Sequence, residues 1–238
     1  MGPGLFIHRH IKVASIHRIY SPYPMTDFVK VFIETERGSD RRYKWNSTTQ
    51  KLDVVRILPH SYRFPYALGF VPNTKTASGE ELPVLCVSER KHKSGVFHFG
   101  YIIGILNIQL MDAAEERNIQ LRNQKYKDEL EEARKKKRGV VVSSPPTEPP
   151  VSSSPIHQIL IMYPIDDLLD NNLNEVYDLD DATLRQIQWF FTHHWEVQGE
   201  TGKSFVFSDF SHRHQAVELY QNAIARWKAA NQIGHSVS

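Results

Sequence analysis

The chain has 238 residues, enough for one domain with a hydrophobic core, and its 40% hydrophobic content is typical of globular proteins. Its 29 basic and 27 acidic residues give a formal net charge of +2, far below that of a dedicated nucleic-acid-binding protein. The lone Cys86 excludes an internal disulfide and fits a reducing compartment. No apolar run approaches the roughly 18 residues that a membrane-spanning helix needs.

The N-terminal segment, residues 1–26, contains no Asp or Glu and carries Arg9, Lys12 and Arg18. Such Arg-rich, acid-poor segments are typical of mitochondrial presequences, which are amphipathic. The glycines and proline at its start, however, disfavour a helix. Two interpretations stay open: a presequence, which would place the protein in mitochondria, or an ordinary N-terminal arm of a cytoplasmic protein.

Several short segments have the composition of β-strands. Residues 28–34 alternate polar and apolar side chains, and residues 51–58 and 82–87 are rich in Val, Leu and Ile. Further strand candidates, separated from these by glycine or proline turns, are 96–106, 158–163 and 204–207. Many short strands with few helices favour a β-barrel.

The middle of the chain has a different composition. Residues 113–138 are dense in Glu, Lys, Arg and Gln, which suits an exposed helix with a narrow apolar seam. Residues 142–155 follow with many serines and prolines and no aromatic residue, which is typical of a mobile linker. The helix is either a solvated surface or, through its seam, a docking surface for a partner.

Two segments near the C-terminus have the apolar spacing of amphipathic helices. In residues 183–194 and 215–227, large apolar side chains recur every three or four positions and fall on one face. We expect both faces to pack on the barrel, so their aromatic residues are interpreted as core and not as a binding site.

The strongest motif is residues 64–87, FPYALGFVPNTKTASGEELPVLCV. It resembles without gaps the central block of bacterial-type soluble inorganic pyrophosphatases, which runs close to YPANYGFIPNTxxxDGDPLDVLV. Ten positions agree in residue type and register: Pro65, Gly69, Phe70, Pro72, Asn73, Thr74, Gly79, Leu82, Val84 and Leu85.

The resemblance covers residues 28–112 and 157–228 and implies the fold of that family. The fold is mainly β with flanking helices (α+β), built on a small OB-like closed β-barrel. On this interpretation residues 27–238 form one domain, interrupted at 113–155 by the charged helix and the linker as an insertion.

The resemblance also implies Mg²⁺ as cofactor, because pyrophosphate hydrolysis needs concentrated positive charge on the substrate and on the attacking water. Mg²⁺ prefers hard oxygen ligands, above all carboxylates. The three aspartates of the DGDPLD block fall here on Ser78, Glu80 and Pro83. Only Glu80 retains a carboxylate, so we expect the magnesium cluster to be depleted.

A second family loop, close to MTDxxGxDxK, contributes two further aspartates. Asp112 resembles the first of them, and the insertion then separates it from His157, which takes the place of the second. A local alternative uses Glu116 instead. The residual metal ligands implied by the resemblance are therefore Glu80 and Asp112, and the insertion is expected to emerge at the rim of the site.

Part of the family's phosphate-facing set remains. Glu34 matches the family's strand glutamate, Arg56 its phosphate-contacting arginine and Arg42 a phosphate-binding lysine, and Lys203 matches a later lysine with a spacing that differs by about one residue. Lys44, in contrast, occupies a glutamate position. The resemblance implies Arg42, Arg56 and Lys203 as phosphate-binding residues, with Glu34, Glu80 and Asp112 as residual catalytic positions.

Three functions remain open from the sequence. The first is a degenerate pyrophosphatase-like protein, without hydrolysis, that serves as a subunit of a larger assembly through residues 113–155. The second is an active inorganic diphosphatase with a reduced Mg²⁺ cluster. The third is a binding module for RNA or a phosphorylated ligand, although exposed aromatics interleaved with basic residues are not evident in the sequence. Family pyrophosphatases are usually dimers or hexamers, so a homodimer is also an expectation.

Overall fold

The computed structural model describes residues 27–59, 62–112, 121, 128, 156–167, 173–193 and 203–234. The predicted presequence or arm at 1–26 and the linker at 142–155 lie outside the described residues. The charged segment 113–138 does so too, apart from positions 121 and 128. Among the described helices, none is long and apolar enough to cross a membrane.

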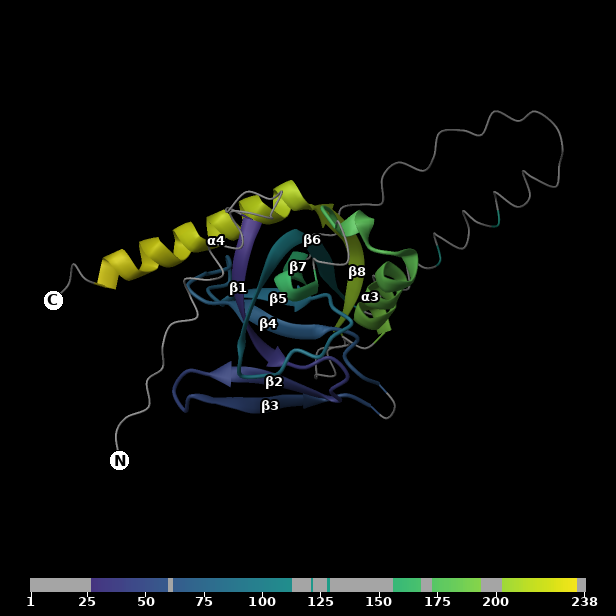
Figure 1. Cartoon of the computed structure of the whole chain (residues 1–238), viewed down its shortest axis with the longest axis horizontal. Coiled ribbons are helices and arrows are strands. Elements are labelled where there is room, and N and C mark those ends of the chain that lie inside the picture. Colours follow the sequence, from purple (N-terminus) through teal and green to yellow (C-terminus); the bar gives the residue numbers. More distant parts are fainter. Residues whose placement is uncertain are drawn as a thin grey trace.

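The centre of the molecule is a curved sheet whose strands follow the order β1-β4-β5-β7-β6-β8, with an additional pairing between β1 and β6 (Figure 1). This pairing closes five of the strands into a ring, which agrees with the predicted barrel. The strands are β1 (Phe28–Thr35), β4 (Ala67–Val71), β5 (Leu82–Cys86), β6 (Phe97–Asp112), β7 (Ile156–Pro164) and β8 (Lys203–His212).

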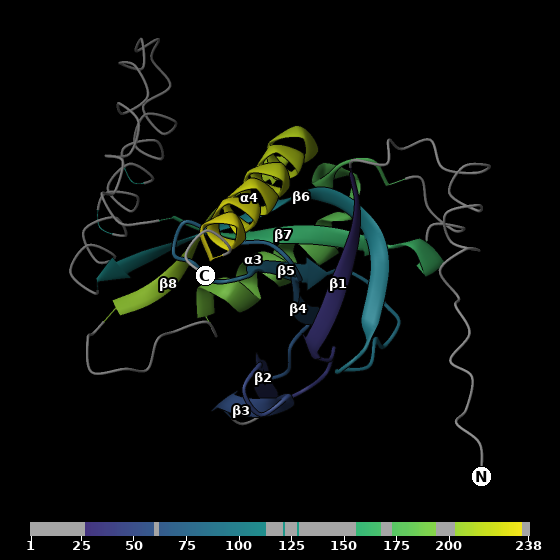
Figure 2. The same ribbon diagram turned by 90° about the vertical axis from the view of Figure 1, so that its left-hand side faces the viewer.

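Strand β6 is long enough to close the ring and to extend beyond it. Its Gly100 pairs with Val29 of β1 on one edge and with Pro164 of β7 on the other. Further along, Gly104 pairs with His212 of β8, so β1 and β8 follow one another along the same edge. Figure 2 shows β1 and β6 curving together beside the crossing helix α4 (Arg213–Gly234).

The sheet packs between two helices. Alternate side chains of the strands form one buried cluster with Ile187, Phe190 and Phe191 of α3 (Asp181–His193). The other alternate set forms a second cluster with Ala216 and Ala223 of α4. Both C-terminal helices therefore pack on the barrel as their apolar spacing predicts, one on each face.

A separate antiparallel hairpin, β2 (Arg41–Asn46) and β3 (Lys51–Ile57), projects from the barrel (Figure 1). Its strands are mostly exposed or half-buried. The hydrophobic pattern alone missed β2, whose sequence RRYKWN has no run of aliphatic residues, and it missed β4. The hairpin is important for the site because it carries three of the basic side chains described below.

Candidate functional site

An open pocket of about 1310 Å³ lies where four parts of the fold meet. Its walls come from the β2–β3 hairpin, the turn of residues 72–81 between β4 and β5, the start of β7 and the C-terminal half of α4. Among the described lining residues, five basic side chains face three carboxylates: Arg42, Lys44, Arg56, Lys75 and Arg226 against Glu34, Glu80 and Glu81. The described pocket is therefore a basic one.

The turn keeps its shape through residues with special backbone roles. Asn73 and Gly79 have positive φ values of 61° and 87°, a region open to glycine and tolerated by asparagine. The buried Thr74 hydroxyl donates to the carbonyl of Val71 and accepts from the amide of Leu82 at 2.9 Å. These motif residues thus hold the turn in place, whatever chemistry the turn supports.

Gly69 of β4 has an equally structural reason to be glycine. A Cβ atom there would lie 2.0 Å from the carbonyl oxygen of Phe32 in β1, closer than real Cβ contacts allow. The match at Gly69 therefore reflects the close approach of β1 and β4, which closes the barrel beside the pocket.

Glu34 lies at the pocket wall and is only 4% exposed. One of its carboxylate oxygens accepts the backbone N–H of Trp45 at 2.6 Å. Burial raises the pKa of Glu34, while this hydrogen bond and the nearby charges of Arg42 and Lys44 act in the opposite direction. Glu34, which the resemblance matches to the family's strand glutamate, is thus hydrogen-bonded to the hairpin and next to two cations.

Arg42 and Arg56 stand directly opposite each other on β2 and β3 and both line the pocket. Burial lowers the pKa of the Arg42 guanidinium, and the charges of Glu34 and Glu80 oppose that shift. Arginine nevertheless stays protonated in proteins. Like charges directly opposite each other destabilise a β-ladder, and the nearby carboxylates of Glu34 and Glu80 offset part of this repulsion at Arg42.

Lys44 and Glu80 form an ion pair across the pocket mouth, with 3.2 Å between Nζ and Oε1. Next to it, burial raises the pKa of Glu81, which the charge of Lys44 opposes and that of Glu80 reinforces. With Glu34, all three described pocket carboxylates are thus influenced by the same ammonium group.

Ser78 and Pro83 lie at the pocket where the family block has aspartates. The Ser78 hydroxyl shares a hydrogen bond with Thr76 at 2.9 Å, and Pro83 stands opposite Phe70 in the β4–β5 ladder. Within the part of the chain that the structure describes, no group of three or more His, Cys, Asp or Glu could hold a metal ion. At these two positions the turn therefore offers no carboxylate, and Glu34, Glu80 and Glu81 are the carboxylates among the described pocket residues.

The remaining predicted site residues lie along β6, β7 and β8. His157 lines the pocket and pairs with Ile108, whereas the backbones of Asp112 and Lys203 pair with each other. Asp112 follows Ile108 by four residues, about 13 Å along a strand. The structure thus brings His157 to the pocket and places Asp112 and Lys203 together further along the sheet, with their side chains outside the description.

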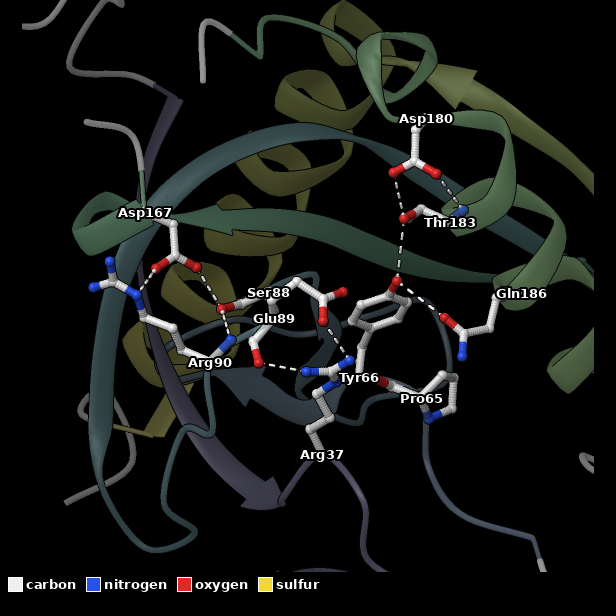
Figure 3. Close-up of polar contacts among 10 residues, drawn as sticks. All are labelled: Arg37, Pro65, Tyr66, Ser88, Glu89, Arg90, Asp167, Asp180, Thr183 and Gln186. Carbon is white, nitrogen blue, oxygen red and sulfur yellow. Dashed lines mark hydrogen bonds and ion pairs between the residues drawn. The ribbon is translucent and has the colours of Figure 1, made fainter. Parts of the chain in front are cut away.

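A second polar cluster, not predicted from the sequence, surrounds Arg37 and Tyr66 (Figure 3). Arg37 donates to the Pro65 carbonyl at 3.0 Å and pairs with Glu89 at 2.6 Å. The buried Tyr66 reaches α3, with its hydroxyl 3.3 Å from Thr183 and 3.2 Å from the carbonyl oxygen of the Gln186 amide. These contacts join β4 to α3 and have a structural role.

Two histidines pack together outside the pocket. The Nδ1 atoms of His92 and His98 are 3.2 Å apart, and the Nε2 atom of each is buried without a hydrogen-bond partner among the described residues. Burial lowers the pKa of both imidazoles, an effect that the negative charges of Asp166 and Asp167 oppose at His92. Such a pair is most stable in its neutral form.

Comparisons with known proteins agree with this architecture. A sequence model described as Inorganic pyrophosphatase matches residues 31–140. The inorganic pyrophosphatase of Neisseria meningitidis serogroup B is 23% identical over 217 residues, which cover 90% of this chain and 98% of that protein. The inorganic pyrophosphatase of Sulfolobus acidocaldarius is 27% identical over 200 residues, covering 84% and 91% of the two chains.

A solved structure shows the same fold. The inorganic pyrophosphatase from Thermus thermophilus matches with a TM-score of 0.63 at 20% identity, over 88% of this chain and 95% of that one. The class is thus a mainly β protein with two packed helices and the pyrophosphatase fold, as predicted. Together with the family-model and sequence matches, this shows that the chain is similar to the soluble inorganic pyrophosphatases in sequence and fold.

Proposed function

We propose that this chain has lost Mg²⁺-dependent pyrophosphate hydrolysis and acts as an interaction subunit of a larger assembly. The observation that carries the proposal is the composition of the pocket. Arg42 and Arg56, which the resemblance matches to phosphate-facing residues, line it, whereas Ser78 and Pro83 stand where the family block has aspartates. If each lost ligand removes only a few kcal/mol of transition-state stabilisation, two losses lower the rate by several orders of magnitude.

The pocket itself supports a binding role. Arg42 and Arg56 face each other with like charge and lie beside only a few carboxylates, an arrangement that favours an anionic ligand such as a phosphate group. Because this attraction needs no metal ion, we propose that anion binding outlasts hydrolysis in this protein.

The direct test is phosphate release from pyrophosphate by the purified full chain at saturating Mg²⁺. We expect turnover far below about 1 s⁻¹, the lower end of typical enzymes. Turnover above that level would overturn the proposal and support the second candidate, an active diphosphatase using Glu34, Glu80 and Asp112. That candidate is favoured by the curated relatives, which carry the name inorganic pyrophosphatase.

The assembly role rests on the insertion at 113–155, whose sequence combines a charged segment with a Pro/Ser-rich one. Deleting these residues should leave a cooperatively melting barrel and reduce co-purification of partner proteins from the native source. Unchanged association would remove the insertion from the proposal. Mitochondrial import is tested separately by fusing residues 1–26 to a fluorescent reporter, with cytoplasmic fluorescence contradicting it.

A further inference from the structure

One lysine, Lys44, lies close to the carboxylates of the pocket. Lys44 of β2 places Nζ 3.2 Å from Oε1 of Glu80 at the pocket mouth. The charge of Lys44 also favours the ionised forms of Glu34 and Glu81. A single ammonium group therefore acts on all three described carboxylates that line the pocket.

The β2–β3 hairpin fixes the position of this ammonium group. Lys44 stands opposite Asp53 in the ladder, two residues after Arg42, and both residues line the pocket although the ladder register shifts between Arg42 and Tyr43. The next residue, Trp45, binds Glu34 through its backbone N–H. The contact that holds Glu34 against the hairpin thus lies beside Lys44 and keeps the lysine near the carboxylates.

We propose that Lys44 is a tethered cation that takes over the charge-neutralising role of a divalent metal ion in this pocket. The proposal deepens the proposed function, since it explains how the pocket carboxylates stay balanced without Mg²⁺. It also goes further, because it makes Lys44 an active barrier to metal binding: even a pocket with restored carboxylates would hold a divalent ion weakly while Lys44 remains.

Electrostatics sets the size of the expected effect. A unit positive charge about 4 Å from a divalent ion repels it enough, even in a water-like medium, to weaken binding by about 30-fold. A water-like dielectric constant is the appropriate one here, since the side chains of Lys44 and Glu80 are 51% and 67% exposed and solvent screens their charges. About 30-fold is therefore the expected scale, and a poorly solvated ion would lose more.

The test is Mn²⁺ binding to the full chain, followed by electron paramagnetic resonance, in a Ser78→Asp, Pro83→Asp background. Adding Lys44→Gln should strengthen Mn²⁺ binding by about 30-fold over that background. The matched control is Lys51→Gln, which removes the same charge from an exposed position of the same hairpin that lies outside the described pocket lining. It should change the affinity by less than about threefold.

Equal Mn²⁺ affinities with and without Lys44 would overturn the inference, as would an equal gain from Lys51→Gln. Should the two aspartates prevent folding, the comparison is made in the otherwise unchanged chain, where Lys44→Gln must bind Mn²⁺ more tightly than Lys51→Gln. The two proposals fail separately. Rapid phosphate release by the unchanged chain removes the proposed function, whereas an inactive chain with no effect of Lys44→Gln removes only the role of Lys44.

Discussion

The β4–β5 hairpin, strands and turn together, contains two sets of residues that differ in their match to the family block. Gly69, Asn73 and Gly79 match the family block, and each has a backbone reason for its identity. Ser78 and Pro83 lie within or just after the same turn and differ from the block. Both sets line the pocket, but the first set also has a backbone role in the shape of the barrel and the turn. The residues that fix the backbone here are therefore different from those that depart from the family block.

The largest expected effect on stability comes from the first set, the residues with a backbone role. Replacing Gly69 with Ala forces a Cβ to 2.0 Å from the Phe32 carbonyl and should lower the free energy of unfolding by about 3 kcal/mol or more. Gly38→Ala is the control, because Gly38 has φ 82° but no atom within 4 Å of its Cβ position. It should cost about 1 kcal/mol. Similar denaturation midpoints for the two variants would refute the close-approach explanation.

The next effect compares two residues of the turn, the buried Thr74, which matches the family block, and the exposed Ser78, which does not. Thr74→Val removes both hydrogen bonds of a buried hydroxyl and leaves the Leu82 amide without its partner, at a cost of about 2–3 kcal/mol. Ser78→Ala changes an exposed residue and should stay within about 0.5 kcal/mol. Urea unfolding measures both. An equal loss of unfolding free energy for Ser78→Ala and Thr74→Val would show that Ser78 also contributes to the stability of the turn.

Anion binding gives a smaller effect. Arg42→Gln removes one charged donor from the pocket, and we expect pyrophosphate affinity in excess EDTA to fall about tenfold by isothermal titration calorimetry. Arg41→Gln is the matched control, since Arg41 is exposed and pairs with Asp40 outside the described pocket lining. Equal losses in the two variants would mean that only the overall charge of the hairpin binds the anion.

The smallest effect concerns pH and lies away from the pocket. Because the pKa values of His92 and His98 are lowered by burial, the unfolded chain binds more protons than the folded one as pH falls below about 6.5. Stability should therefore rise with pH through this window and fall on acidification. Thermal melts of the full chain and of a His92→Gln variant check this, and an equally steep pH dependence in the variant would contradict it.

Much of the fold followed from the sequence because the block at 64–87 contains backbone-determining residues whose identity is nearly forced. The hairpin strand β2 could not be predicted from pattern, since its exposed sequence RRYKWN has no core face to repeat. Strand β6 also extends to Asp112, beyond the predicted end at residue 106, because its second half, which mixes polar and apolar residues, is paired with β8.

Five residues that the sequence analysis named line one pocket: Glu34, Arg42, Arg56, Glu80 and His157. Their roles stay predictions.

Contacts between distant segments were not predictable. The Lys44–Glu80 pair joins residues 36 apart, and the Tyr66 hydroxyl reaches residues 117 and 120 positions away. Such pairs depend on how the hairpin and α3 fold against the barrel, which no local pattern encodes.

The central claim is that an anion-binding pocket persists without its metal cluster. It is tested most directly by calorimetric titration of the full chain with pyrophosphate, once in excess EDTA and once at saturating Mg²⁺. We predict binding in EDTA that Mg²⁺ does not strengthen, because Arg42, Lys44 and Arg56 supply the positive charge. An affinity that rises tenfold or more with Mg²⁺, about 1.4 kcal/mol, or binding seen only with Mg²⁺, would contradict the claim.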